Sequence, residues 1–185
     1  MAKHISPEYQ QLLQDYHQAN IGWAKSGARF YERARELVAE HKPRSLLDYG
    51  CGKGVLVSML NQSFPQLVTD LYDPGVPEFD HDPVPADMVT CTDVLEHIEP
   101  EHIEQALYHL QALTKKVAYF VVHTGDCGHK LPDGRPAHIL QRSQQWWMEK
   151  LTEVYCPAGF ELSFKDTGLP MRFEAVAVRI DDAPA

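Results

Sequence analysis

The stretch that decides the fold is Ser45-Leu46-Leu47-Asp48-Tyr49-Gly50-Cys51-Gly52-Lys53-Gly54. Its first residues are typical of the end of a short buried strand, three alternate glycines form a turn, and the apolar run over 55–60 suits a helix packed on a sheet. In α/β folds, a strand, a glycine-rich turn and a helix in this order bring the backbone close to a nucleotide-like ligand. Glycine is needed there because a Cβ would block that approach and because such turns often require positive φ.

Asp48 stands two residues before the first glycine of this turn and narrows the choice of ligand. A dinucleotide-binding turn has the pattern G-x-G-x-x-G and holds a pyrophosphate at the helix N-terminus. Here the pattern is G-x-G-x-G, and a carboxylate at the mouth of the turn would repel a pyrophosphate. It would attract a ligand with an ammonium or sulfonium group and no phosphate, such as S-adenosylmethionine (SAM). A structural turn in another α/β protein is the alternative.

Two motifs resemble those of a known family. The stretch 47–54 is similar to the first motif of the class I SAM-dependent methyltransferases, and the segment 93–98 resembles the one that follows the fourth strand in many small-molecule members. The resemblance covers about residues 25–180. The stretch 131–135 and the Trp146-Trp147 pair also resemble a compact branch of these enzymes seen in bacteria and phages. The resemblance implies SAM as the cofactor.

The expected fold is α/β, with a Rossmann-like, doubly wound, mostly parallel sheet and an antiparallel hairpin at its C-terminal end. The strands are predicted at 45–47, 67–73, 88–92, 117–122, 160–166 and 172–180. Residues 75–86 are too rich in proline for a helix, so we expect a fold trimmed between the second and fourth strands of the family. We predict a single domain over 1–185, with an N-terminal helical cap at 1–42 and a Rossmann-like core at 43–180.

An acid follows the second predicted strand. Asp73 lies 21 residues beyond Gly52, at a strand end where a carboxylate can accept hydrogen bonds from a ribose diol. The resembling family uses an acid there for the same purpose. The segment after the 88–92 strand is expected to face the cofactor as well. The predicted cofactor-binding residues are Asp48, Tyr49, Gly50, Cys51, Gly52, Asp73, Pro74, Asp93, Val94 and Leu95.

The long loop 123–138 follows a strand that is predicted to be buried on both faces. Ligands of open α/β sheets bind outside the carboxyl ends of the strands, so this loop is where an acceptor should lie. An amine or hydroxyl acceptor must lose a proton, and the pKa of histidine lies near neutrality. We therefore predict His123, His138 and Asp126 as catalytic residues, with a loop-ordering hydrogen bond as the alternative for each histidine. His123, Asp126 and His129 are a further option as metal ligands, but we predict no metal.

The N-terminal region is predicted to form helices over 7–20 and 28–41, the first with Ser6 as N-cap. Elements of this kind often cap the cofactor in the resembling family. For Tyr9, His17 and Lys25, however, we favour ordinary surface positions.

The composition limits which binding partners and which cellular compartment we expect for the protein. The 185 residues carry a formal net charge of −9, which argues against a nucleic-acid backbone as the main partner. No apolar run approaches the ~20 residues of a membrane span. The N-terminus lacks the apolar core of a signal peptide, and the four scattered cysteines suit reduced thiols. We expect a cytoplasmic protein.

The predicted function is SAM-dependent methyl transfer to a nitrogen or oxygen atom of a small-molecule, nucleotide-like or sugar-like acceptor. The sequence lacks an Asn/Asp-Pro-Pro-Tyr/Phe motif at Asp93 and a Pro-Cys pair, which disfavours DNA methylation without excluding RNA. A non-catalytic SAM-binding partner or sensor of the same fold is the second hypothesis. A nucleotide-dependent oxidoreductase is the third, and Asp48 and the glycine spacing argue against it.

Overall fold

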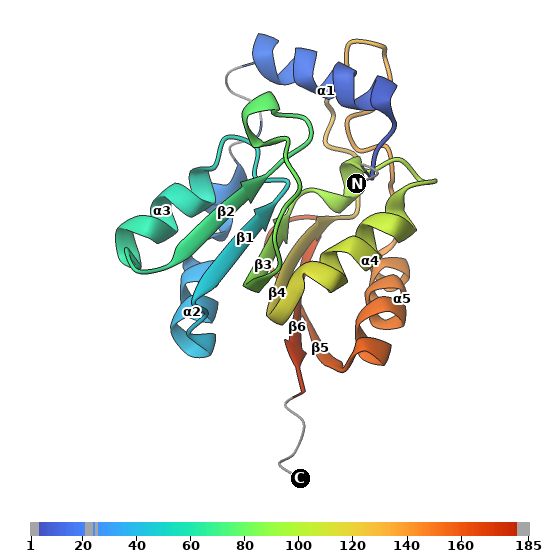
Figure 1. Cartoon of the computed structure of the whole chain (residues 1–185). Coiled ribbons are helices and arrows are strands. Elements are labelled where there is room, and N and C mark those ends of the chain that lie inside the picture. Colours follow the sequence, from blue (N-terminus) through green and yellow to red (C-terminus); the bar gives the residue numbers. More distant parts are fainter. Residues whose placement is uncertain (1–3, 21–23, 25, 181–185) are drawn as a thin grey trace.

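The computed structural model of the chain describes residues 4–20, 24 and 26–180. They contain a six-stranded sheet in the order β2-β1-β3-β4-β6-β5 (Figure 1). The strands are β1 (Ser45–Tyr49), β2 (Val68–Tyr72), β3 (Ala86–Thr92), β4 (Thr114–His123), β5 (Phe160–Asp166) and β6 (Arg172–Arg179). β1 runs parallel to β2 and β3, and β3 runs parallel to β4, whereas β6 is antiparallel to both β4 and β5. The predicted mostly parallel sheet with a C-terminal antiparallel hairpin is confirmed.

Helices cover both faces of this sheet (Figure 1). They are α2 (Tyr31–His41), α3 (Val55–Ser63), α4 (Ile103–Leu113) and α5 (Gln144–Tyr155). Val117, Tyr119 and Val121 of β4 pack in one apolar cluster with residues of α2 and α3, whereas Ala118 and Phe120 join residues of α4 and α5 in another. Successive side chains of a strand point to opposite faces, so the continuous apolar run of β4 serves two cores at once. The doubly wound arrangement is therefore confirmed.

The helix α1 (Pro7–Ala19) lies across the carboxyl ends of the strands (Figure 1). The Ser6 hydroxyl accepts a hydrogen bond from the Tyr9 N–H at 3.2 Å, so the predicted N-cap is present. The side-chain amides of Gln10 and Gln14 donate to the carbonyl of Pro74 at 3.1 and 3.0 Å. These bonds fix the helix to the turn that follows β2.

Two of the three N-terminal residues that we assigned to the surface are buried. Tyr9 is 1% exposed and His17 is 7% exposed. Tyr9 packs with Leu131 and Ala137 of the loop between β4 and α5, which closes over α1. The surface assignment was wrong for both residues because contacts between distant segments leave no local pattern. Tyr9 meets a loop more than a hundred residues away, and His17 lies beside Lys53 and Gly75. Lys25 lies outside the described residues.

The remaining elements are short 3₁₀ helices. They are η1 (Ser26–Phe30), η2 (Pro77–Phe79), η3 (Leu95–His97) and η4 (Cys156–Ala158). η1 precedes α2, where we predicted one continuous helix over 28–41. η2 is the one helical or strand element between β2 and β3, so β2 is an edge strand, and its Val68 is 70% exposed. The predicted trimming of this part of the fold is confirmed.

In the part of the chain that the structure describes, no helix has the length and apolar character required to span a membrane.

Candidate functional site

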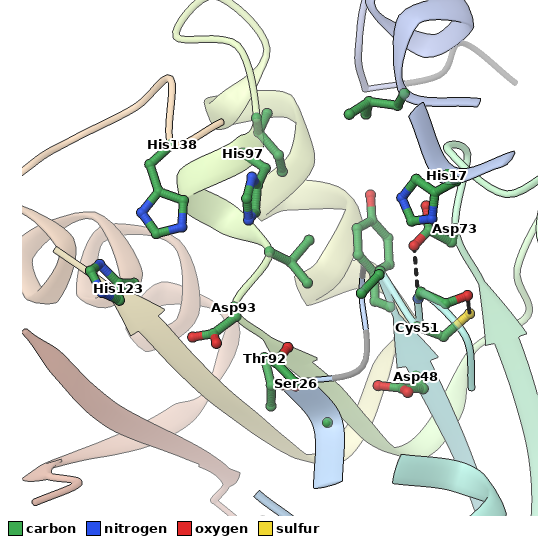
Figure 2. Close-up of a pocket in the computed structure, with 18 of the residues that line it drawn as sticks. His17, Ser26, Asp48, Cys51, Asp73, Thr92, Asp93, His97, His123 and His138 are labelled. Carbon is green, nitrogen blue, oxygen red and sulfur yellow. Dashed lines mark hydrogen bonds between the residues drawn. The ribbon is translucent and has the colours of Figure 1, made fainter. Parts of the chain in front are cut away.

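A cavity of about 630 Å³ lies at the carboxyl ends of β1, β2, β3 and β4. This volume is within the usual range for a small-molecule site. In Figure 2, His17, Asp48, Cys51 and Asp73 lie at one end of the cavity. The histidines His97, His123 and His138 gather at the other end, and Thr92 and Asp93 lie between the two groups.

Most of the residues predicted for the site line this cavity. They include the three predicted catalytic residues and nine of the predicted cofactor residues, namely His123, Asp126 and His138 together with Asp48, Tyr49, Gly50, Cys51, Gly52, Asp73, Pro74, Asp93 and Val94. Leu95 is the exception. Its side chain is fully buried in the apolar cluster beneath α4 and does not reach the cavity.

The glycine turn after β1 has the geometry that its sequence requires. Gly50 and Gly52 have φ values of +75° and +55°, in the left-handed region that favours glycine. A Cβ on Gly50 would lie 2.4 Å from the side chain of Val94, and one on Gly52 would lie 2.6 Å from Ala24. The backbone can therefore form this wall of the cavity only with glycine at both positions.

Asp48 lies at the end of β1 and is 3% exposed. One of its carboxylate oxygens accepts a hydrogen bond from the Thr90 hydroxyl at 2.7 Å. Burial raises the pKa of Asp48 to about 7, and the nearby carboxylate of Asp73 adds to this, whereas the bond from Thr90 opposes it. At neutral pH the negative charge of Asp48 is therefore costly, and a cation bound in the cavity would stabilise it.

Asp73 follows β2 and braces the glycine turn. Its two carboxylate oxygens accept hydrogen bonds from the N–H groups of Gly52 and Gly75, each at 2.8 Å. Burial raises the pKa of Asp73, although these two bonds hold it down. A carboxylate has about four lone-pair sites, so Asp73 can still accept hydrogen bonds from hydroxyl groups of a ligand.

The N-terminal segment supplies one wall of the cavity, including His17, Ser26 and Arg29. The N–H of Lys53 donates to the carbonyl of Ala24 at 3.1 Å, and its ammonium donates to the carbonyl of His17 at 3.3 Å. Burial and the charge of Lys53 lower the pKa of His17 to about 4, so its imidazole is neutral at pH 7. The sequence held no local signal that these residues meet the glycine turn.

Between the two ends of the cavity lies an ion pair that the sequence did not reveal. The Arg172 guanidinium donates to the two oxygens of Asp93 at 3.0 and 3.3 Å. Asp93 has a φ of +53°, an uncommon conformation for a residue with a side chain. The two residues are 79 positions apart, and β6 brings them together by pairing antiparallel with β4.

Three histidines form the other end of the cavity. The ring centroid of His138 lies 4.8 Å from that of His97 and 4.6 Å from that of His123. The Nδ1–H of His97 donates to the carbonyl of Ala137 at 2.8 Å, and that of His138 donates to the carbonyl of Gly125 at 2.7 Å. Burial lowers the pKa of all three histidines, that of His97 to about 3, so they are neutral at pH 7.

The other polar residues of the loop after β4 are arranged differently. Asp126 and His129 line the cavity at its exposed rim, and Asp126 accepts a hydrogen bond from the N–H of Gly128 at 2.9 Å. Among the described residues, the possible metal ligands that converge are Glu96, His97 and His138, and not the combination of His123, Asp126 and His129. Glu96 and His97 belong to the segment 93–98 that carries the family resemblance, but neither is among the predicted site residues.

The comparisons with known proteins agree with this geometry. Residues 17–169 match the model of a family described as a methyltransferase domain. A comparison with curated proteins gave no match.

Several solved structures have the same fold. An O-methyltransferase family protein from Burkholderia thailandensis has a TM-score of 0.57 and 15% identity over 92% of this chain and 70% of its own. Human N-acetylserotonin methyltransferase in complex with SAM has a TM-score of 0.56 and 18% identity over 93% of this chain and 56% of its own. The plantazolicin methyltransferase BpumL in complex with a triazolic desmethylPZN analogue and S-adenosylhomocysteine (SAH) has a TM-score of 0.61 and 12% identity over 94% of this chain and 92% of its own. At these identities the similarity establishes the fold alone.

Proposed function

The chain belongs to the methyltransferase-domain family, and from this we propose that it is an enzyme that transfers a methyl group from SAM to a nitrogen or oxygen atom of a small-molecule, nucleotide-like or sugar-like acceptor. Bound SAM supplies an electrophilic methyl group on a sulfonium. The chain's own task is then to hold the acceptor in line with that methyl group and to accept the proton that the acceptor loses.

The observation that carries this proposal is the pair of acids at the glycine turn. Asp73 braces the turn through Gly52 and retains acceptor sites for a ribose diol. Asp48 offers a buried carboxylate that a cationic ligand would stabilise. Tyr49, Cys51, Pro74 and Val94 also line this end of the cavity and would contact the rest of the cofactor.

The charges of the cavity favour SAM over a dinucleotide. Among the described residues, its wall holds four aspartates, namely Asp48, Asp73, Asp93 and Asp126. The arginines of the wall are Arg29 and Arg172, and the second of these is paired with Asp93. An excess of carboxylates attracts the sulfonium and ammonium groups of SAM and repels a pyrophosphate.

The histidine end of the cavity suits the acceptor. The Nδ1–H of His138 is engaged by the Gly125 carbonyl, so in the neutral ring Nε2 carries the lone pair that can accept a proton. His123 is the second candidate for this role, because its ring lies beside that of His138. Asp126, at the exposed rim, adds negative charge near the entrance.

We further propose that residues 1–42 act as a cap over the cofactor and that residues 43–180 form the core of one domain over 1–185. The support is that His17 and Ser26 line the same cavity as the glycine turn. Gln10 and Gln14 also bind α1 to the turn after β2.

Calorimetry with SAM, SAH and NAD tests the cofactor. We expect binding of the first two and none of NAD. Asp48→Ala and Asp73→Ala should each weaken SAM binding, because losing a hydrogen bond or charge contact to the ligand costs roughly 1.5–3 kcal/mol, or about ten- to a hundredfold in affinity. Unchanged SAM affinity in both variants would show that the assigned site is wrong.

Turnover against a pool of metabolites with radiolabelled SAM then tests the activity. Methylation of any component supports an enzyme. Tight SAM binding with no methylated product would favour the alternative, a non-catalytic SAM-binding partner or sensor.

A further inference from the structure

We propose that Glu96, His97 and His138 bind a divalent transition-metal ion at the histidine end of the cavity, and that this ion binds the hydroxyl oxygen of the acceptor. The second part rests on the proposed methyl transfer, whereas the first does not.

The three residues converge from two separate segments. Glu96 and His97 belong to η3, directly after β3, and His138 belongs to the loop between β4 and α5. One ligand atom from each lies within 4.8 Å of the others. In a tetrahedral site, ligand atoms about 2.1 Å from the ion lie about 3.4 Å apart, so the three groups need to approach one another by up to about 1.4 Å.

The two imidazoles are oriented as metal ligands are. Both donate their Nδ1–H to a backbone carbonyl, His97 to Ala137 at 2.8 Å and His138 to Gly125 at 2.7 Å. In each neutral ring this bond fixes the tautomer in which Nε2 carries the lone pair. Histidines that bind metals almost always have such a hydrogen bond on their other nitrogen. Figure 2 shows the two rings side by side at the cavity wall.

Glu96 is a separate observation that points to a cation. Its side chain is 0% exposed, and one oxygen accepts a hydrogen bond from the His123 N–H at 3.1 Å. The other oxygen is buried and has no hydrogen-bond partner in the described structure. By contrast, both oxygens of Asp73 accept hydrogen bonds, from the N–H groups of Gly52 and Gly75. An unsatisfied buried oxygen is costly, and an ion bound to it would remove that cost.

The ligand set indicates the class of metal. Imidazole nitrogens suit zinc, iron, cobalt and related ions, whereas magnesium and calcium prefer sites built from oxygen atoms. Three protein ligands leave coordination positions open, as in catalytic sites. Because His97 and His138 line the cavity, those positions face the space assigned to the acceptor.

Such an ion would favour acceptors that carry a hydroxyl group and would make that group easier to deprotonate. A Lewis acid lowers the pKa of a bound hydroxyl group, so an alcohol or phenol can react near neutral pH. Because the Nε2 lone pair of His138 is then bound to the ion, the base is His123, whose ring lies next to that of His138, and the hydroxyl proton leaves to it. The oxygen lone pair then forms the O–CH₃ bond while the S–CH₃ bond breaks and its electron pair remains on sulfur. The products are a methyl ether and neutral SAH, so the inference narrows the acceptor from nitrogen or oxygen to a hydroxyl group.

The test begins with the metal alone. The full chain, stripped with a chelator, is titrated with Co²⁺ and followed by visible absorption, and with Zn²⁺ and Mn²⁺ by calorimetry. We expect one ion per chain with at least micromolar affinity for one of these metals, and cobalt bands typical of nitrogen and oxygen ligands. No saturable binding up to millimolar metal would overturn the proposal.

Variants locate the ion. Glu96→Gln keeps the shape of the side chain, and we expect it and His138→Ala to weaken binding at least a hundredfold, since even the loss of a supporting group costs 10–100-fold. His129→Ala is the matched control, because it removes a histidine from the rim of the same cavity, and we expect no change. Loss of binding in His129→Ala with retention in Glu96→Gln would refute the assignment. Thermal melts identify any variant that fails to fold. If a variant does fail, the cobalt titration of the parent protein still tests whether the chain binds a metal ion.

SAM affinity, measured in parallel, separates the two proposals. SAM binding without metal binding would contradict the proposed metal site and leave the proposed function intact. Metal binding without SAM binding leaves the ion site and contradicts the proposed function. If the metal-loaded protein methylates an amine but no hydroxyl compound, the assignment of a hydroxyl group as the acceptor is wrong.

Discussion

Replacing Asp48 with asparagine should stabilise the ligand-free protein against unfolding at alkaline pH and lower its affinity for SAM. Asparagine keeps the oxygen that accepts the 2.7 Å hydrogen bond from the Thr90 hydroxyl, and it removes the charge. The variant therefore isolates the electrostatic role of Asp48 from its role in packing.

The magnitude follows from the pKa of the carboxyl. It rises from 3.8, the ordinary value, to about 7 in the folded protein. Between these values the folded state binds more protons than the unfolded state, so the contribution of Asp48 to stability falls as pH rises through this window and levels off above about 7. Integrated from pH 5 to pH 8, the loss is about 2–3 kcal/mol. The Asp48→Asn variant has no carboxyl group at this position, so it should not lose this stability.

The assay is urea unfolding of the ligand-free parent and variant at pH 5 and pH 8. We expect the stability difference, variant minus parent, to become more favourable by about 2–3 kcal/mol at the higher pH. Groups that do not interact with Asp48 titrate equally in both proteins, so their effects cancel in this difference, and the interaction with Asp73 is a smaller contribution than burial. A variant that is less stable than the parent at pH 8, or a difference that does not change with pH, would refute the argument.

The same variant should bind SAM about ten- to a hundredfold more weakly at pH 8. The affinity of the parent should itself fall below pH 7, as Asp48 takes up a proton, and that of the variant should not. A gain in stability together with a loss of binding is the mark of a residue retained for its ligand. Equal SAM affinity in parent and variant would remove Asp48 from the site.

Three further changes test other parts of the site. Asp73→Asn should lower SAM affinity about ten- to a hundredfold in calorimetry, because one acceptor oxygen becomes a donor that faces a backbone N–H or a ribose hydroxyl; parent-like affinity would exclude the ribose role. His123→Ala or His138→Ala should leave SAM affinity within about threefold but lower methyl transfer, by about 10²–10⁴ for the residue that acts as general base; unchanged turnover in both would return them to a structural role. Gly50→Ala should destabilise the fold by about 1–3 kcal/mol in urea unfolding, because φ is +75° and the new Cβ lies 2.4 Å from the side chain of Val94; removing the clash with Val94→Ala should restore only part of this, and full recovery would show that the backbone is not strained.

Much of the fold could be predicted because its signals are local. The glycine turn, the apolar run that becomes β4 and the proline-rich link between β2 and β3 each show their structure within about ten residues of sequence. The positions of Asp48 and Asp73 in the cavity wall could be predicted for the same reason, since Asp48 lies at the carboxyl end of a strand and Asp73 directly after one.

The rest depends on contacts between distant segments. Arg172 reaches Asp93 because β6 pairs with β4, and no local pattern specifies that register. His138 meets His97 across 41 positions only after its loop folds back over η3. The long loop was correctly placed near the cavity, but three histidines close in sequence suggested a cluster of their own. The structure places His123 beside His138, leaves His129 at the exposed rim and adds His97 from the motif after β3.

The alternation of side chains along β4 limits where residues can be inserted into or deleted from the sequence of this protein. A single residue inserted between Val117 and Val122 would exchange the side chains that enter the two cores and turn His123 to the opposite face. An insertion between Asp126 and Lys130, on the exposed rim, would leave the sheet in register. In the course of evolution, new acceptors can therefore be gained by insertions and deletions in that loop, while the strand that carries it must keep its number of residues.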